Sequence, residues 1–200
     1  MRQPRPCNAA EAITRARSLV GRGGQYVLGT GDYRPSREQG RYVDLPWTTR
    51  DGLTGSDCAG FAISWCYKLP RHRLGFNAGA WASVSDDLNC NSIDEDADHE
   101  QDLGERLVRP ELGALLLYPT FRLAGYPRPF IGHVAIVVRI SRALEWDVTQ
   151  PDYSLLDVAQ CCGPDERKPA VIATSGRHWN DHDQRWPKAE HRSRLLRVRA

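Results

Sequence analysis

The pattern of apolar and polar positions predicts helices in the first part of the chain. A first helix is expected after Asn8, because Asn8 and Glu11 have the spacing of a capping box. The apolar residues that follow at helical intervals are Ile13, Ala16, Leu19 and Val20. A second, buried helix is expected from Cys58 to Trp65, where most side chains are apolar and either Ser56 or Asp57 can cap the first turn.

From residue 107 onward the pattern changes to short apolar runs rich in β-branched side chains, which predict strands. Four strands are expected, over residues 115–118, 133–140, 155–160 and 170–173. The second and third should pair antiparallel through the turn near residues 147–153. Helices followed by a run of strands predict an α+β fold.

Length and composition predict one domain. The chain has 200 residues, enough for a single core. We expect one domain over residues 1–200, with a core at about 9–175 and a basic C-terminal extension over 176–200. The six cysteines do not have the spacing of a disulfide framework, so free thiols in a reducing cytoplasm are expected. We expect the protein to be a monomer.

Charge and hydropathy exclude several classes of partner. A net charge of +2 is too small to predict binding to nucleic acid. No apolar segment has the length needed to insert into a membrane. The first residues lack the apolar core of a signal peptide, so synthesis in the cytoplasm without one is expected.

Two groups of residues have some features of metal sites. Carboxylates occupy positions 1, 3, 5, 9 and 12 of a calcium-loop spacing at Asp94, Asp96, Asp98, Asp102 and Glu105. His99 stands where that loop needs glycine, so a solvated acidic loop is favoured, and calcium binding by residues 94–105 is left open. A second group consists of Cys161, Cys162, His178 and His182. Adjacent cysteines in a strand point to opposite faces, which argues against zinc, and no metal or cofactor is expected.

The candidate chemistry lies in Cys58 and His133. Cys58 is expected in the first turn of its helix, where the helix dipole favours the thiolate, although a small buried cysteine is an alternative interpretation. His133 begins the predicted strand at residues 133–140. An imidazole there can activate a thiol from a neighbouring helix, since such pairs are adjacent in space and not in sequence.

Four segments together resemble the papain-like cell-wall peptidases of the NlpC and CHAP groups. Asp57-Cys58-Ala59-Gly60-Phe61 is similar to the nucleophile segment, and Gly132-His133-Val134-Ala135-Ile136-Val137 to the histidine strand. Residues 24–31 resemble the tyrosine-glycine segment before the cysteine, and residues 110–118 the strand that enters the sheet. The resemblance covers roughly residues 9–175. It implies a papain-like fold, with N-terminal helices and the nucleophile at a helix start packed on a central antiparallel sheet.

The resemblance also implies a third catalytic residue on the strand after the histidine strand. Gln160 is the candidate, because it shares a strand face with Leu156 and Val158 and its carbonyl can accept from an imidazole N–H. Asp157 lies on the other face and is the second choice. Tyr26 and Asp57 match the family's residues that hold the peptide stem of the substrate, so both are candidates for substrate binding.

The implied activity is that of a cysteine peptidase that hydrolyses stem or cross-bridge amide bonds of peptidoglycan through an acyl-enzyme. The expected setting is a phage or prophage lysin or a tail-associated enzyme, which acts at the cell wall after release or as part of a phage particle. N-acetylmuramoyl-L-alanine amidase activity on the same fold is an alternative. A non-catalytic binding or assembly module is another, because Ala59 and Ala114 stand where the family often has Ser and Asp.

Overall fold

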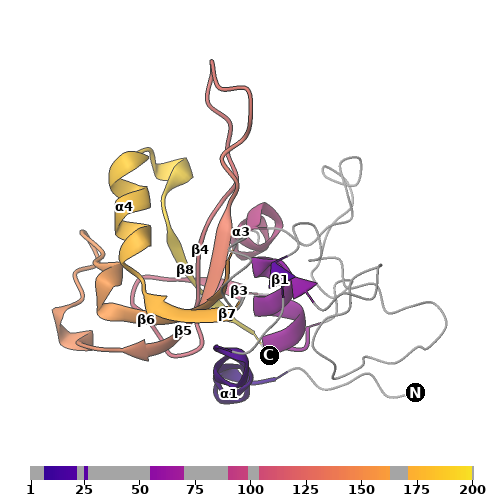
Figure 1. Ribbon diagram of the computed structural model, residues 1–200. Helices are drawn as coiled ribbons and strands as arrows, with labels where there is room; N and C mark the ends of the chain where they lie inside the picture. The colour runs from indigo at the N-terminus through magenta and orange to yellow at the C-terminus, as the bar shows by residue number, and fades with distance from the viewer. Residues whose placement is uncertain are drawn as a thin grey trace.

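A six-stranded antiparallel sheet organises the chain in the computed structural model (Figure 1). The structure describes residues 7–21, 25–26, 55–69, 90–98, 104–162 and 171–199. In spatial order the strands are β3 (Gly104–Leu107), β8 (Arg194–Val198), β4 (Leu115–Tyr118), β5 (His133–Ile140), β6 (Leu156–Cys161) and β7 (Val171–Ser175). This arrangement confirms the predicted α+β class and the antiparallel pairing of β5 with β6.

Helices lie against both faces of the sheet, because apolar side chains of the central strands alternate between the faces. Leu115 and Leu117 belong to the core beneath α1 (Ala9–Leu19), the π-helix η1 (Gly60–Cys66) and α3 (Cys90–Asp98). Leu116 belongs to the core on the other face, with Trp179 of α4 (Arg177–Arg185). Figure 1 shows α1 and α4 on opposite sides of strands β6 and β7. The described residues also form three short 3₁₀ helices, η3 (Ala143–Glu145), η4 (Tyr153–Leu155) and η5 (Ala189–His191), and a separate pair of two-residue strands, β1 (Gln25–Tyr26) and β2 (Gly55–Ser56).

Both predicted helices are present. Asn8 and Glu11 form the expected capping box, in which each side chain bonds to the backbone N–H of the other. The second helix begins at Cys58 and continues as η1. No helix within the described ranges is long and apolar enough to cross a membrane.

The C-terminal residues differ from the expected basic extension outside the core. Residues 177–185 form α4, and β8 lies inside the sheet between β3 and β4. Leu195 and Leu196 are both buried, one on each face of the sheet. Because arginines surround these two leucines in the sequence, apolar periodicity gives no sign of a central strand.

The arginines of β8 form ion pairs with carboxylates from distant segments of the chain. Arg194 forms an ion pair with Asp94 of α3 at 3.3 Å, and Arg197 pairs with Glu105 and Glu111. Asp94 is 7% exposed and also pairs with Arg106 at 2.9 Å. The segment around Asp94 is therefore helical and partly buried, which corrects the expectation of a solvated acidic loop; His99 and Asp102 lie outside the described residues.

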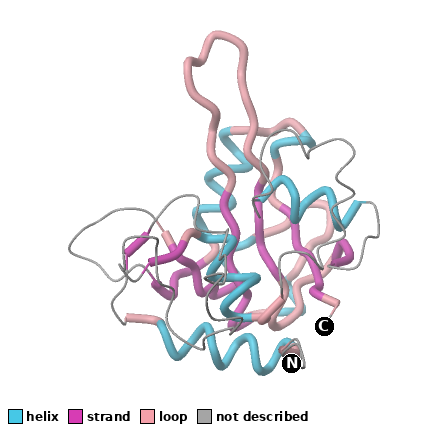
Figure 2. Tube along the Cα trace, turned by 90° about the vertical axis from the view of Figure 1, so that its right-hand side faces the viewer, coloured by secondary structure: helices cyan, strands magenta, loops and turns pink. Residues whose placement is uncertain are grey.

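The connection between β4 and β5 projects well beyond the sheet as a long arm (Figures 1 and 2). Phe121 and Phe130 pair across it through an isolated antiparallel bridge, and their rings stack with centroids 5.2 Å apart. The two sides of the arm are thereby held together just above the strands. His133 begins β5 directly after this connection.

The position of β8 leads to a stability prediction. Leu196→Ala should lower the free energy of unfolding by about 2–5 kcal/mol, the usual cost of truncating a buried leucine, because Leu196 is 1% exposed within the core under α1. The matched control is Leu144→Ala, whose side chain is fully exposed. Urea unfolding checks both variants, and equal stability of the two would contradict a central β8.

Candidate active site

Asp57 fixes the start of the helix that carries Cys58. Its carboxylate Oδ1 accepts a hydrogen bond from the Gly60 N–H at 2.7 Å, and its carbonyl accepts from the Phe61 N–H at 3.0 Å. Asp57 is buried, so this cap is shielded from water. Of the two predicted caps, Asp57 is therefore in place, and the side chain of Ser56 lies outside the described part of the chain.

A short parallel pair of strands lies immediately before this helix. Strand β1 (Gln25–Tyr26) pairs with β2 (Gly55–Ser56), with Tyr26 opposite Ser56. The backbone of Tyr26 is therefore next to Ser56, two residues before Cys58. The side chain of Tyr26 lies outside the described residues, so its expected role in substrate binding stays a prediction.

The structure brings Cys58, His133 and Gln160 together. The His133 side chain and the Val134 N–H are both close enough to the Cys58 thiol to lower its pKa. On the other side of the imidazole, His133 Nε2 lies 2.7 Å from Gln160 Oε1. Cys58 and Gln160 are each 5% exposed, whereas His133 is partly exposed.

Strand register explains why Gln160 and not Asp157 reaches the imidazole. Gln160 is opposite Ala135, two residues along β5 from His133, so both side chains lie on one face. Asp157 lies on the opposite face of β6 and forms an ion pair with Arg139. Among the described residues, the amide is thus the group next to the second ring nitrogen.

The electrostatic surroundings favour a thiolate at Cys58. A hydrogen bond from the Cys90 thiol lowers the pKa of Cys58 most; burial opposes it, and the hydrogen bond to His133 and its charge lower the pKa further. The net result is a pKa well below the usual range of cysteine. Cys90 itself has a raised pKa, because it donates to Cys58 and is buried, so it stays a protonated donor.

The imidazole shows the complementary shift. Burial by itself would lower the pKa of His133, but the hydrogen bond and charge of Cys58 and the hydrogen bond to Gln160 outweigh it, so the pKa is raised. A lowered thiol pKa and a raised imidazole pKa favour transfer of the proton from sulfur to ring nitrogen. Both shifts favour the thiolate and imidazolium form of the pair, which is the reactive state of a cysteine nucleophile.

Aromatic side chains surround the imidazole. The Trp179 ring stacks near His133 with centroids 5.7 Å apart, and the rings of Tyr118 and His178 lie at 6.2 and 5.8 Å. Burial lowers the pKa of His178 to about 4, helped by the charges of His133 and His182, so that ring is neutral at neutral pH. These residues narrow the space in which the imidazole can turn.

Close packing explains why glycine occupies position 132, directly before the histidine. A Cβ atom at this position would lie 2.7 Å from the backbone of Tyr118 and Thr120 and 2.8 Å from the Cβ of Cys90. A side chain would therefore push apart β4, β5 and α3. The Gly132-His133 pair lets the histidine strand approach Cys90 and the thiol next to it.

Three further residues complete the site without being marked by any sequence motif: Cys90, Thr174 and Trp179. Cys90 begins α3, Thr174 lies on β7 and accepts a hydrogen bond from Gln160 Nε2 at 2.8 Å, and Trp179 lies on α4. Their contacts with the site depend on tertiary packing. The only local signal is a cysteine at position 90 next to an acidic stretch, and it does not indicate its partner.

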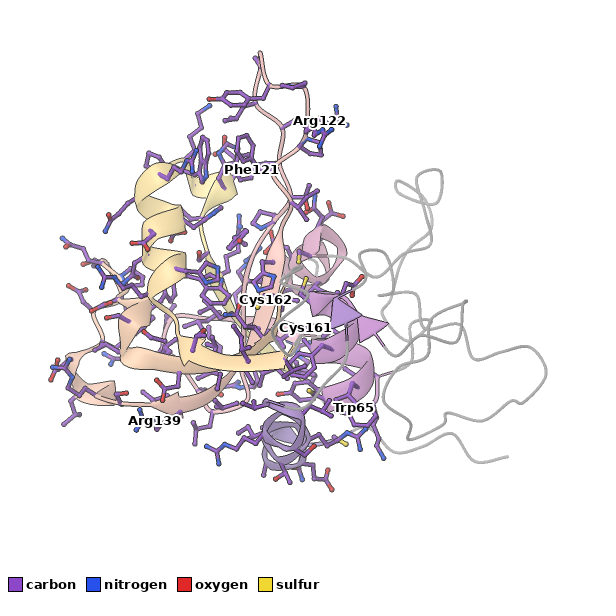
Figure 3. All side chains as sticks on the ribbon, in the orientation of Figure 1. Trp65, Phe121, Arg122, Arg139, Cys161 and Cys162 are labelled. Atoms are coloured by element: carbon purple, nitrogen blue, oxygen red, sulfur yellow. The ribbon has the colours of Figure 1, made fainter. Side chains whose placement is uncertain are left out.

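The residues considered for zinc are separated by their packing. Cys161 is buried in the core near η1, where burial raises the pKa of its thiol (Figure 3). The His182 ring stacks on Tyr118 with centroids 3.8 Å apart, and His182 Nε2 lies 2.9 Å from the carbonyl of His191. Within the described ranges, no group of three or more His, Cys, Asp or Glu side chains is arranged to hold a metal ion.

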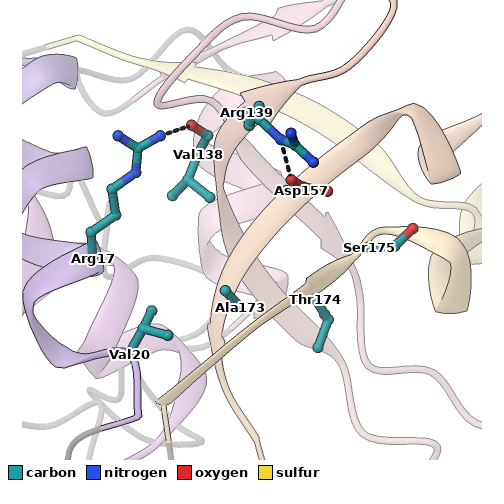
Figure 4. Close-up of a pocket in the computed structure, with 8 residues that line it drawn as sticks. All are labelled: Arg17, Val20, Val138, Arg139, Asp157, Ala173, Thr174 and Ser175. Carbon is teal, nitrogen blue, oxygen red and sulfur yellow. Dashed lines mark hydrogen bonds and ion pairs between the residues drawn. The ribbon is translucent and has the colours of Figure 1, made fainter.

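A surface pocket shares Thr174 with the site, but Cys58, His133 and Gln160 are not among the residues that line it (Figure 4). It is lined by Arg17, Val20, Val138, Arg139, Asp157, Ala173, Thr174 and Ser175. Arg17 donates to the carbonyl of Val138 at 2.7 Å and Arg139 pairs with Asp157, so both cations in its wall already have partners. The pocket is next to the distal end of β5, while His133 is at the start of that strand.

Comparison of the chain with models of protein families, with curated proteins and with solved structures found no match.

The hydrogen bond from Cys90 leads to a prediction for thiol reactivity. Cys90→Ala should move the midpoint of the pH profile for alkylation of Cys58 by iodoacetamide to higher pH, because the thiolate loses a donor. Cys90→Ser keeps a donor and should move the midpoint less. The matched control is Cys66→Ala, which removes another buried thiol from the same core. Mass spectrometry of the Cys58 peptide follows the reaction, and identical profiles for wild type and Cys90→Ala would contradict this role of Cys90.

Proposed function

We propose that this chain is a papain-like cysteine hydrolase that cleaves an amide bond in the peptide part of peptidoglycan. The observation that carries the proposal is the contact of a capped helix-start thiol with an imidazole whose other nitrogen meets an amide oxygen. Nucleophile, base and orienting group in this order are the recurring arrangement of acyl-transfer enzymes. Here the roles fall to Cys58, His133 and Gln160.

The proposed reaction begins with attack of the Cys58 thiolate on the carbonyl carbon of the amide. His133 Nε2 is next to Gln160, which leaves Nδ1 as the nitrogen that exchanges a proton with the thiol. The tetrahedral intermediate collapses when the imidazolium gives its proton to the leaving amine, and a thioester to Cys58 remains. The neutral imidazole then takes a proton from water, which attacks the thioester and releases the carboxylate and the thiolate.

Backbone donors at the helix start can stabilise the oxyanion. Asp57 occupies the cap and accepts from the Gly60 N–H, so the Cys58 N–H at the first turn is the nearest candidate donor for an oxyanion on the substrate. A backbone donor does not depend on the side chain of residue 59, so Ala59 is compatible with this role.

The substrate class is supported by the resemblance of four sequence segments to NlpC- and CHAP-type peptidases. Under this proposal Asp57 serves both as helix cap and as a neighbour of the bound peptide stem, and Tyr26 contacts that stem from β1. A phage or prophage lysin, or a tail-associated enzyme, is the proposed setting. The proposal leaves both a peptide bond and the amide between N-acetylmuramic acid and L-alanine as possible targets.

Digestion of purified peptidoglycan tests the proposal. Wild type should release soluble fragments, and Cys58→Ala should release none above background, because the acyl-enzyme cannot form. Cys66→Ala is the matched control and should retain activity, since this buried thiol lies at the far end of η1. Mass analysis of new termini distinguishes a peptidase from an amidase. If neither wild type nor control releases fragments while fragments bind to both, a binding module replaces the proposed hydrolase.

A further inference from the structure

A hydrogen-bonded chain continues from the imidazole to strand β7. Gln160 Oε1 lies 2.7 Å from His133 Nε2, and Gln160 Nε2 donates to Thr174 Oγ1 at 2.8 Å. Thr174 is opposite Val158 in the register of β6 and β7, and Val158 shares its strand face with Gln160. One face of three adjacent strands thus carries the imidazole, the amide and the hydroxyl.

The oxygen and the nitrogen of the Gln160 amide are not interchangeable in this series of hydrogen bonds. A protonated imidazole presents an N–H to Gln160, and only the amide oxygen can accept it. The amide nitrogen must then find an acceptor, and Gln160 is 5% exposed. The hydroxyl of Thr174 supplies this acceptor. Without it, a buried amide N–H would lack its partner, and the opposite rotamer would direct that N–H at the imidazole N–H.

We propose that Thr174 is a positioning residue whose hydroxyl holds the Gln160 amide with its oxygen towards His133. This inference rests on the proposed function. The direction of the Gln160 amide matters because the imidazolium must keep its orientation during acyl transfer. Thr174 acts through Gln160. It therefore affects the orientation of the imidazole without contact with the reacting atoms.

The other titratable neighbours of His133 have pKa values shifted away from neutral pH. The titratable side chains around it are Cys58, Cys90 of α3, Tyr118 of β4 and His178 of α4. Burial raises the pKa of Tyr118, Cys90 has a raised pKa as donor to Cys58, and burial lowers the pKa of His178 to about 4. A change in the alkylation profile of Cys58 therefore reports on the Cys58–His133 pair.

Two variants of Thr174 separate positioning from packing. Thr174→Val keeps the β-branched shape that suits a strand and removes the acceptor, whereas Thr174→Ser keeps the acceptor and removes a methyl group. Gln160→Ala provides the reference for complete loss of the amide. Thr149→Val is the matched control, since Thr149 is exposed and bonds to Asp147 in a turn.

Two readouts are used on the full chain: the pH profile of Cys58 alkylation, and kcat and KM on peptidoglycan fragments. Thr174→Val should move the alkylation midpoint to higher pH and lower kcat about tenfold, the effect of one hydrogen bond, with KM unchanged. Thr174→Ser should restore both readouts, and Thr149→Val should match wild type.

Three outcomes would overturn the inference. One is a Thr174→Val profile that matches wild type while Gln160→Ala is shifted, which would mean that the amide is held without Thr174. Another is an equal loss in Thr174→Val and Thr174→Ser with a lower Tm in both, which would indicate packing. The third is an unshifted Gln160→Ala. If no peptidoglycan fragment is cleaved by wild type but the alkylation shifts follow the hydroxyl, the proposed function fails and the positioning role stands.

Discussion

The contact between Cys58 and His133, whose pKa shifts favour an ion pair, is the interaction on which the rest of the site depends. Separating charge in a nearly buried place is costly unless each ion is hydrogen-bonded. The structure supplies those bonds from different elements: the Cys90 thiol and the Val134 N–H at the sulfur, and the Gln160 oxygen at the ring. The site is therefore a small network of donors and acceptors, in which each member reduces the cost of the ion pair.

This network requires a particular junction of helix and sheet. Asp57 caps the helix that carries the Cys58 thiol. Gly132 allows β4, β5 and α3 to pack closely enough for Cys90 to reach that thiol. The sheet then places Gln160 and Thr174 on the strands that follow β5 in space. On its other side the sheet continues through β4 into β8, so residues near the C-terminus support the strands that carry the imidazole.

Local sequence patterns predicted those parts of the fold and site whose physical causes are local. The capping box at Asn8, the cap at Asp57 and the β-branched strand after His133 each depend on a few neighbouring residues. Period-two alternation was enough to place Gln160 and Asp157 on opposite faces. Strand β8 could not be predicted in this way, because its arginines are neutralised by carboxylates about a hundred residues away. Cys90 and Thr174 could not be predicted from local patterns either, because only tertiary packing brings them to the site.

The most direct test of the central claim is the protonation state of the His133 ring at neutral pH, measured by ¹⁵N NMR of the imidazole in wild type and Cys58→Ser. The thiolate raises the pKa of His133 against the opposing effect of burial. The account predicts two protonated ring nitrogens in wild type and a neutral ring in Cys58→Ser, where burial is no longer opposed by a thiolate. A neutral ring in wild type would contradict the ion pair, and with it the reactive form of Cys58.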